Sequence, residues 1–292
     1  MTFASVFLAI ALQVPPTAQA EGASPFDFND GDRVVVIGST LIEREQAGGY
    51  WELALTLRNK DKAVTFRNLG WSGDTVWGES RGSFDGQAKG YAKLLELTKE
   101  LKPTVIVLCY GQNESYAGDT RLKAFAAQYE KLLKDLAATK ARFVLMSPTP
   151  FQEVKPLKGA KAKNENLAKY VAATKELATA RKVDFVDAFG SLVGKPAVPT
   201  ENGIHYSDEG YRGTRTIFSA GETIDNSATD DLRKAIVAKN ELFFHRWRPQ
   251  NETYLFGFRK HEQGKNGKEI AEFDPLVAKE EAKIAELRAK LK

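Results

Sequence analysis

Two hydroxyl residues directly after an apolar run are the first place where this sequence can carry chemistry. Residues 34–43 read VVVIGSTLIE, so Ser39 and Thr40 follow Gly38 at once. A hydroxyl becomes a nucleophile when a neighbouring base takes its proton. His205, in the segment NGIHY, is the candidate base. Adjacent side chains on a tight turn point in different directions, so only one of the two hydroxyls can face this histidine.

Two further residues are suited to bind the negative oxygen that forms when a hydroxyl attacks an ester. Gly73 lies in the segment NLGWSGDT (68–75), where glycine permits a positive φ and close approach of a substrate to a bare backbone N–H. Asn113 lies in GQNE (111–114) and offers a neutral amide donor that does not titrate. These two residues are the candidate oxyanion donors.

The elements that must position these residues follow from the hydrophobic pattern. Helical periodicities separate five short runs rich in Val and Ile, which predicts βαβ units, a parallel sheet and helices on both of its faces. The carboxyl ends of parallel strands form the edge at which such sheets bind ligands, and the candidate residues follow predicted strands. The five predicted strands are Arg33–Gly38, Ala63–Asn68, Thr104–Tyr110, Arg142–Ser147 and Val183–Val186.

The order of these blocks resembles the SGNH hydrolase superfamily, also called the GDSL-type esterases. Its patterns G-D-S-L, N-x-G-x-x-G-x-T, G-x-N-D and D-G-x-H are similar to the turn after Gly38 and to residues 68–75, 111–114 and 202–205, and the resemblance runs from about Asp32 to about Ser219. It implies a flavodoxin-like three-layer α/β/α sandwich with a five-stranded parallel sheet. It also implies hydrolysis of ester bonds, such as deacylation of carbohydrate or small acyl esters.

By the same resemblance, Gly73 and Asn113 are the oxyanion donors and His205 is the general base. Four aromatic residues flank the blocks and are candidates for contact with a sugar ring, although each alone reads more simply as a packing residue: Trp71, Trp77, Tyr110 and Tyr116.

The sequence departs from the family pattern at two catalytic positions. Thr40 stands where the family has its serine nucleophile, with Ser39 in the preceding aspartate position, and Asn202 stands where the family has an aspartate three residues before the histidine. The extra methyl group of threonine crowds the attacking oxygen. Asparagine can orient an imidazole but cannot stabilise its cation; in a serine protease the Asp-to-Asn exchange costs about 10⁴ in rate.

Two functions from different classes remain open at this point. The first is an ester hydrolase with an unusual Thr/His or Ser/His pair, and it is favoured because Gly73, Asn113 and His205 are all present. The alternative is a degenerate member that binds a glycan or another ligand without turnover. Glu201 or Asp208 could replace the missing carboxylate, although a helix-capping role is the simpler expectation for Asp208.

Composition excludes several other classes of function. The chain has 292 residues, of which 42% are hydrophobic and 27% charged, and its net charge is +4, which is typical of a globular protein. The basic residues are interspersed with acidic ones, so no nucleic-acid partner is expected. The three histidines show no metal-ligand spacing, and neither a metal nor a cofactor is expected. Cys109, the only cysteine, reads as a buried core residue, so no internal disulfide forms.

The two ends of the chain differ from the middle. Residues 1–20 contain an apolar run, Pro15-Pro16 and the small-x-small site Ala18-Gln19-Ala20, which predicts a signal peptide and export to the periplasm or the medium. The apolar run is too short to span a membrane, and no later segment reaches that length. Residues 21–227 are predicted to form the hydrolase-like domain and residues 228–292 an appendage packed on it. The pattern does not indicate an oligomeric state.

The appendage itself is expected to alternate between helical and non-helical segments. It should be helical over Leu232–Arg246, extended over Arg246–Phe258, a polar loop over 261–269 and helical again from Asp274.

Overall fold

The core of the molecule is a sheet of five parallel strands in the order β2-β1-β3-β4-β5. The computed structural model describes residues 24–221 and 226–291, except 83, 85 and 156. The strands confirm the five predicted runs to within two residues at either end. They are β1 (Arg33–Gly38), β2 (Thr65–Asn68), β3 (Val105–Cys109), β4 (Arg142–Met146) and β5 (Asp184–Val186), and all neighbours pair in parallel.

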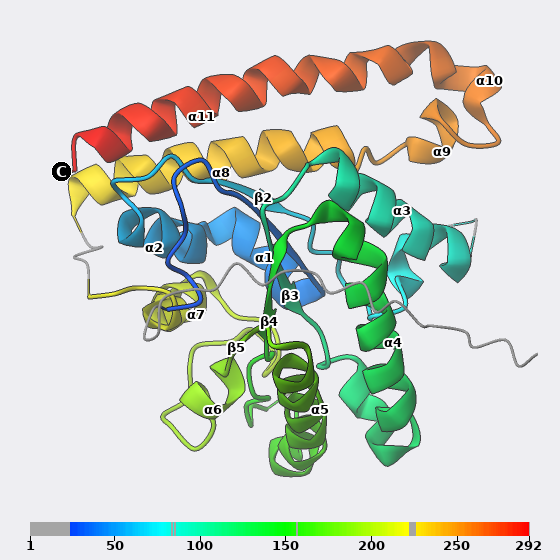
Figure 1. Ribbon diagram of the computed structural model, residues 1–292, viewed down its shortest axis with the longest axis vertical. Coiled ribbons are helices and arrows are strands. Elements are labelled where there is room, and N and C mark those ends of the chain that lie inside the picture. The colour runs from blue at the N-terminus through cyan, green and yellow to red at the C-terminus, as the bar shows by residue number, and fades with distance from the viewer. Residues whose placement is uncertain (1–23, 83, 85, 156, 222–225, 292) are drawn as a thin grey trace, which may run out of the picture.

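Helices cover both faces of this sheet, as Figure 1 shows. Alternate strand residues point to opposite faces: Val34 and Val105 pack in one apolar cluster, and Val35 and Ile106 in the other. Helices that contribute to the first cluster are α1 (Thr40–Gly48), α2 (Tyr50–Arg58), α7 (Asp208–Thr214) and α8 (Ser227–Trp247). Helices that contribute to the second are α3 (Gln87–Glu100), α4 (Leu122–Leu136) and α5 (Ala160–Arg181).

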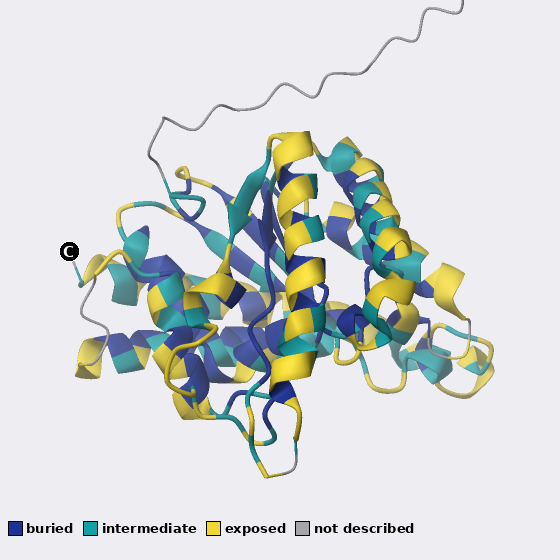
Figure 2. Ribbon diagram, turned by 90° about the horizontal axis from the view of Figure 1, so that it is seen from below, coloured by how far each residue is buried: buried dark blue, intermediate teal, exposed yellow. Residues whose placement is uncertain are grey.

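The predicted three-layer α/β/α sandwich is therefore confirmed, and the strand order is that of flavodoxin-like folds. Figure 2 shows the central strands in the buried colour, with exposed residues on the outward sides of the helices. Short elements complete this part of the chain: α6 (Ala188–Leu192), η1 (Glu79–Arg81), η3 (Glu114–Thr120), η4 (Ala137–Thr139) and η5 (Arg215–Ile217). No helix in the described part of the chain is both long enough and apolar enough to span a bilayer.

The C-terminal segment is helical almost throughout. After α8 come α9 (Glu252–Leu255), α10 (Lys260–Gln263), η6 (Gly264–Glu272) and α11 (Phe273–Ala289). Helix α11 runs back along α8 (Figure 1), and its residues Ile284 and Leu287, with Leu291 just after it, pack in the first cluster. The seam of α11 therefore docks on this chain. The boundary between a domain of residues 21–227 and an appendage of 228–292 stays a prediction.

Two expectations for this segment are wrong. The aromatic stretch Arg246–Phe258 is not extended, because α8 continues to Trp247 and α9 follows. Pro249 accounts for the break between them: Arg248, the residue before it, has left the helical region at φ −133° and ψ 65°. Residues 261–269 are not a loop but turns of α10 and η6.

A buried ion pair joins α8 to α2 and β2. Lys239 Nζ donates to both carboxylate oxygens of Glu52, at 2.7 and 2.9 Å, and to the carbonyl of Phe66 at 3.1 Å. Asn240 Nδ2 donates to the same carboxylate at 3.0 Å. Because the pair is almost completely buried, removing either partner alone would leave an uncompensated charge inside the fold.

Candidate active site

The turn after β1 directs Thr40, and not Ser39, toward the candidate oxyanion donor. Ser39 is the N-cap of α1, is 5% exposed, and its backbone carbonyl accepts the first hydrogen bonds of the helix. Thr40 is the first residue of α1, and its Oγ1 accepts a 3.0 Å hydrogen bond from the backbone N–H of Gly73. The register that places Thr40 at the family's serine position is thus the one that brings a hydroxyl to Gly73.

Residues 68–73 lie against α1 through contacts that depend on asparagine and glycine. Asn68 Nδ2 donates to the carbonyl of Ile42 at 2.7 Å, and Asn68 Oδ1 accepts from Gly70 N at 2.8 Å. A Cβ atom on Gly70 would lie 2.2 Å from Glu43 N, so only glycine fits. Gly73 has φ +74°, the left-handed region that glycine tolerates best. These contacts explain why this block needs Asn and Gly at their observed spacing.

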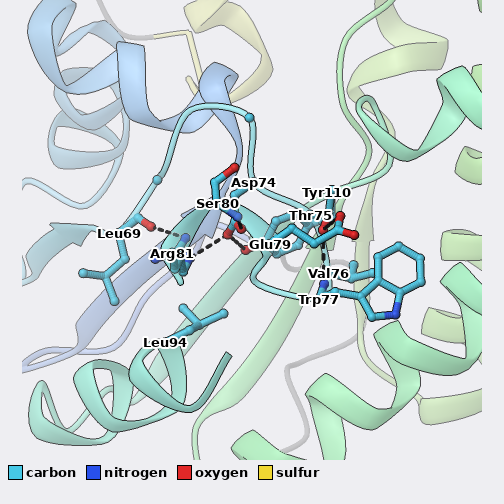
Figure 3. Close-up of polar contacts among 12 residues, drawn as sticks. Leu69, Asp74, Thr75, Val76, Trp77, Glu79, Ser80, Arg81, Leu94 and Tyr110 are labelled. Carbon is cyan, nitrogen blue, oxygen red and sulfur yellow. Dashed lines mark hydrogen bonds and ion pairs between the residues drawn. The ribbon is translucent and has the colours of Figure 1, made fainter. Parts of the chain in front are cut away.

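The second donor reaches the same place through Asp74, the residue after the candidate oxyanion glycine. Asn113 Nδ2 donates to the carbonyl of Asp74 at 2.8 Å, which leaves its second amide hydrogen for a substrate. The Asp74 carboxylate is fully buried and accepts from Arg81 Nε at 2.5 Å and from Tyr110 Oη at 3.0 Å (Figure 3). Arg81 also donates to the carbonyl of Leu69, at 2.7 Å.

This buried trio makes the loop rigid, and the sequence did not reveal it. An aspartate and an arginine seven residues apart in a Gly-rich segment suit many surface arrangements; only the tertiary structure buries them. Tyr110, which the sequence offered as a candidate for contact with a sugar, is instead a buried hydrogen-bond donor to this carboxylate.

Glu114 joins the loops that carry the two donors. Its carboxylate oxygens accept from Val76 N and from Gly111 N, both at 2.9 Å. Burial raises the pKa of Glu114 to about 7, against the opposing effect of these backbone donors. Glu114 is the last residue of the GQNE block, and that position was the only feature of the sequence that pointed to a role in the site.

The segment that carries His205 is fastened along α1. Arg44, one helical turn after Thr40, makes a 2.6 Å ion pair with Glu201. Tyr211 Oη donates to the carbonyl of Leu41 at 2.8 Å. Contacts on either side of the histidine therefore bind its segment to the helix that begins with the candidate nucleophile.

The two carboxylates considered as replacements for the missing aspartate have other partners. Glu201 is paired with Arg44. Asp208 accepts from Tyr50 Oη at 2.7 Å. The expectation that Asp208 caps the next helix is wrong, because the N-cap is Ser207, whose Oγ accepts from Gly210 N at 3.2 Å.

The contact between Asn202 and His205 determines the tautomer of the imidazole. Asn202 Oδ1 accepts from the backbone N–H groups of Ile204 at 3.1 Å and His205 at 2.9 Å. Since backbone N–H groups only donate, the amide orientation is fixed, and Nδ2 is the group that lies 3.2 Å from His205 Nδ1. Nδ1 must then accept, so the ring proton sits on Nε2.

The charge state of His205 follows from its surroundings. Burial, and next the positive charge of Arg44, lower the pKa of His205 below 6.5, while Glu201 opposes them. The imidazole is therefore neutral at pH 7. In this resting state Nε2 is a hydrogen-bond donor, whereas a general base needs a free lone pair at that atom.

The fold and the order of the candidate site residues agree with those of a known protein family. A family model for the GDSL-like lipases/acylhydrolases matches residues 36–212. The chain belongs to this family. It is thus an ester hydrolase by family, and the GDSL-type resemblance in its sequence blocks is confirmed.

Solved structures with the same fold are distant in sequence. A catalytic mutant of an acetylxylan esterase from Geobacillus stearothermophilus is 17% identical, covers 66% of this chain and 94% of its own, and has a TM-score of 0.52. An α/β hydrolase from the metagenome of Lake Arreo is 19% identical, with coverages of 67% and 96% and a TM-score of 0.50. The chain spans 46% of a gut microbial diltiazem-metabolizing enzyme, at 21% identity, 65% coverage of this chain and a TM-score of 0.48. No curated protein matches it.

The candidate residues thus fall into two groups. In the first group Gly73 N donates to Thr40 Oγ1, and Asn113 is linked to Gly73 through the carbonyl of the next residue, Asp74. Asn202 and His205 form the second group. The Arg44–Glu201 ion pair holds the second group against the helix of the first. Their roles in catalysis stay predictions. Among the described residues, no three His, Cys, Asp or Glu side chains are grouped as a metal site.

Proposed function

We propose that this family member hydrolyses esters with Thr40 as the nucleophile. The observation that carries the proposal is the 3.0 Å hydrogen bond from Gly73 N to Thr40 Oγ1, because it places the only hydroxyl of the turn that is not buried beside an oxyanion donor. Thr40 Oγ1 attacks the carbonyl carbon and its proton passes to His205 Nε2. The carbonyl oxygen becomes an anion held by the Gly73 N–H and the Asn113 amide. Collapse of this intermediate expels the alcohol, which takes the proton, and water then releases the acid from Thr40.

The resting tautomer makes this reaction slower than it would be with an aspartate at position 202. Before His205 can accept a proton at Nε2, its own proton must move to Nδ1, where it would face the Nδ2 donor of Asn202. Two donors pointing at each other are unfavourable, so the reactive tautomer is sparsely populated. We expect measurable but slow turnover.

We further propose that the ester is an acyl group on a carbohydrate. Solved structures of the same fold include acetylxylan esterases, which supports this substrate class. In one of these esterases, variants in which a serine or an aspartate is replaced by alanine are catalytic mutants, which supports a hydroxyl nucleophile. Aromatic residues follow β2 and β3: the rings of Trp71 and Trp77 are covered by Arg248 and Arg121, at 3.7 and 4.3 Å, whereas Tyr116 is 54% exposed. Exposed aromatic faces are suited to stack on the apolar faces of sugar rings.

The test compares the full-length chain with single variants on p-nitrophenyl acetate and acetylated xylooligosaccharides. Thr40→Ala and His205→Ala should each lose the activity above background, and Thr40→Ser should keep or increase it, because serine lacks the crowding methyl group. Ser39→Ala is the matched control and should keep most of the activity. Retained rate in Thr40→Ala with loss in Ser39→Ala would move the nucleophile to Ser39. No difference between the wild type and His205→Ala would favour a protein that binds without turnover.

The N-terminal prediction is part of the same proposal. Residues 1–20, which the structure does not describe, are proposed to direct export, with cleavage near Ala20. Fractionation of a bacterial host that expresses the full-length chain, with mass measurement of the product, tests this; an uncleaved product in the cytoplasm would contradict it.

A further inference from the structure

The residue that follows α8 touches both the loop that carries Gly73 and the helix that begins with Thr40. The guanidinium carbon of Arg248 lies 3.7 Å from the centroid of the Trp71 ring. Its Nη1 makes a 3.0 Å ion pair with Glu43 Oε2. Trp71 belongs to the loop that carries Gly73, and Glu43 lies on α1, three residues after Thr40. One side chain from outside the family match therefore bridges the loop and the helix.

The carboxylate of Glu43 sits next to the oxyanion donor. The same oxygen that pairs with Arg248 also accepts a hydrogen bond from the backbone N–H of Ser72, the residue before Gly73. A negative charge there would oppose the negative oxygen that forms in the transition state. Arg248 neutralises that charge, and with side chains only 24% and 18% exposed the pair is less screened than a surface ion pair.

Arg248 is held in place before any substrate arrives. Its backbone N–H donates to the carbonyl of Phe244 at 2.9 Å, at the end of α8. The neighbouring Trp247 is buried and packs edge-on against Trp71, with ring centroids 5.7 Å apart. Helix α8 is itself anchored by the buried pair of Lys239 and Glu52. The guanidinium is thus held against the loop by an anchored helix. Side chains that position a functional site need this kind of support.

We propose that Arg248 is a positioning residue of the ester hydrolase site, so that the C-terminal helical segment takes part in catalysis. It holds the loop of Trp71–Gly73 against α1 and neutralises Glu43 beside the oxyanion. This inference rests on the proposed roles of Thr40 and Gly73.

The experiment measures kcat and KM for Arg248→Gln beside a matched control, Arg246→Gln. Arg246 lies two residues earlier and pairs at 2.8 Å with Asp274 of α11, whereas Arg248 pairs with Glu43 of α1. We expect kcat to fall about tenfold in Arg248→Gln, with KM within about twofold, since small displacements of a positioned donor reduce rate rather than ground-state binding. Arg246→Gln should leave both constants unchanged. Arg248→Lys, which keeps the charge but not the stacking, should recover part of kcat.

A double variant separates neutralisation from simple packing. In Glu43→Gln/Arg248→Gln no unpaired carboxylate remains near the oxyanion, so kcat should exceed that of Arg248→Gln alone. Equal or lower kcat in the double variant would refute the electrostatic part of the proposal. Non-additivity of this kind is expected only for residues in direct contact.

Amide hydrogen exchange gives a readout that does not depend on turnover. The peptide spanning residues 68–75 should exchange faster in Arg248→Gln than in the wild type and in Arg246→Gln. Unchanged exchange and unchanged kcat in Arg248→Gln would overturn the proposal. Equal losses of kcat in Arg248→Gln and Arg246→Gln would also overturn it, because the C-terminal segment would then have only a structural role. Faster exchange in a protein whose wild type shows no Thr40-dependent turnover would instead refute the proposed function, and with it any catalytic role of Arg248.

Discussion

The side chain at position 202 decides which nitrogen of His205 can work as a base. Two backbone N–H groups fix the orientation of the Asn202 amide, so its Nδ2 faces Nδ1 of the ring. An aspartate in the same place would accept the same two backbone hydrogens with one oxygen and leave the other to accept from Nδ1–H. That arrangement puts the lone pair on Nε2 and stabilises the imidazolium.

Asn202→Asp should therefore be a gain-of-function substitution. We expect kcat/KM on p-nitrophenyl acetate to rise by about 10² to 10⁴, the upper value being the loss seen for the reverse exchange in a serine protease. Asn113→Asp is the control, because it replaces a donor with a carboxylate at the proposed oxyanion site and should abolish activity. An unchanged or lower rate in Asn202→Asp would show that the tautomer does not limit the reaction.

The pH profile of the same variant provides an independent check. In the wild type, burial and Arg44 hold the pKa of His205 below 6.5, so the acid limb of kcat/KM should lie below that pH. An adjacent carboxylate favours the cation and raises the pKa of the imidazole. The acid limb of Asn202→Asp should therefore move to higher pH than in the wild type. A shift in the opposite direction would mean that another group controls this limb.

At the scale of residues, the sequence predicted where the candidate residues lie better than it predicted their partners. The places of Thr40, Gly73 and Asn113 after strands were predictable because block order is a local feature. The partners of Asp74, Arg44 and Glu201 were not, since each is paired with a residue from another element and a surface position would suit it equally well.

At the scale of elements, the site depends on how closely the loop after β2 approaches α1. The structure leaves no room for a side chain at Gly70, because a Cβ there would lie 2.2 Å from the nitrogen and 2.7 Å from the Cα of Glu43. These are backbone atoms of a helix and cannot move aside as a flexible side chain would. The position of the loop is thus set by a glycine, and the position of Gly73 follows from it.

Gly70→Ala should displace the loop and reduce both activity and stability. We expect a loss of about 1–3 kcal/mol in the free energy of unfolding, as for overpacking elsewhere, and loss of most esterase activity. Gly213→Ala in α7 is the matched control: an added Cβ there meets nothing within 4 Å, and alanine is the better helix former. Urea unfolding and esterase assays measure both effects. A Gly70→Ala protein with wild-type stability and rate would contradict the close approach.

The elements themselves were predictable to different degrees. The strands are short apolar runs that alternate with segments of helical periodicity, and the structure places them within two residues of the predicted bounds. The helical state of the stretch 246–258 was not predictable, because it depends on residues that are buried against other elements, as Trp247 is against Trp71. Tertiary packing there overrides the local preference of aromatic residues for extended structure.

At the scale of the whole molecule, α1, α2 and α8 meet around a group of buried charges. Glu45 of α1 is fully buried, and its Oε1 accepts from Trp51 N at 2.9 Å and from Glu52 N at 3.3 Å. Glu52 in turn holds Lys239 of α8. The helix that begins with Thr40 is therefore joined to the C-terminal segment through ionisable groups, which makes the stability of the fold sensitive to pH.

Glu45 sets the direction in which the free energy of unfolding changes with pH. Burial, and next the charge of Glu52, raise the pKa of Glu45 to about 7 from an ordinary value of 4.5, while the backbone donors and Lys239 oppose them. Between these two values the folded protein binds more protons than the unfolded chain, so stability falls as pH rises through this window. A difference of this size corresponds to at most about 3 kcal/mol.

Glu45→Gln removes the ionisation but keeps an oxygen for the two backbone donors. The variant should match the wild type near pH 5, where Glu45 is protonated in the fold, and should be more stable at pH 8, where the wild type carries a buried charge. Urea unfolding at the two pH values measures this, with Glu96→Gln on the exposed side of α3 as the control. Glu114, whose pKa is also raised to about 7, is unchanged in both proteins and cancels in the comparison. If the stability difference between Glu45→Gln and the wild type were the same at pH 5 and pH 8, Glu45 would not titrate in this window and the buried cluster would owe its stability to hydrogen bonds alone.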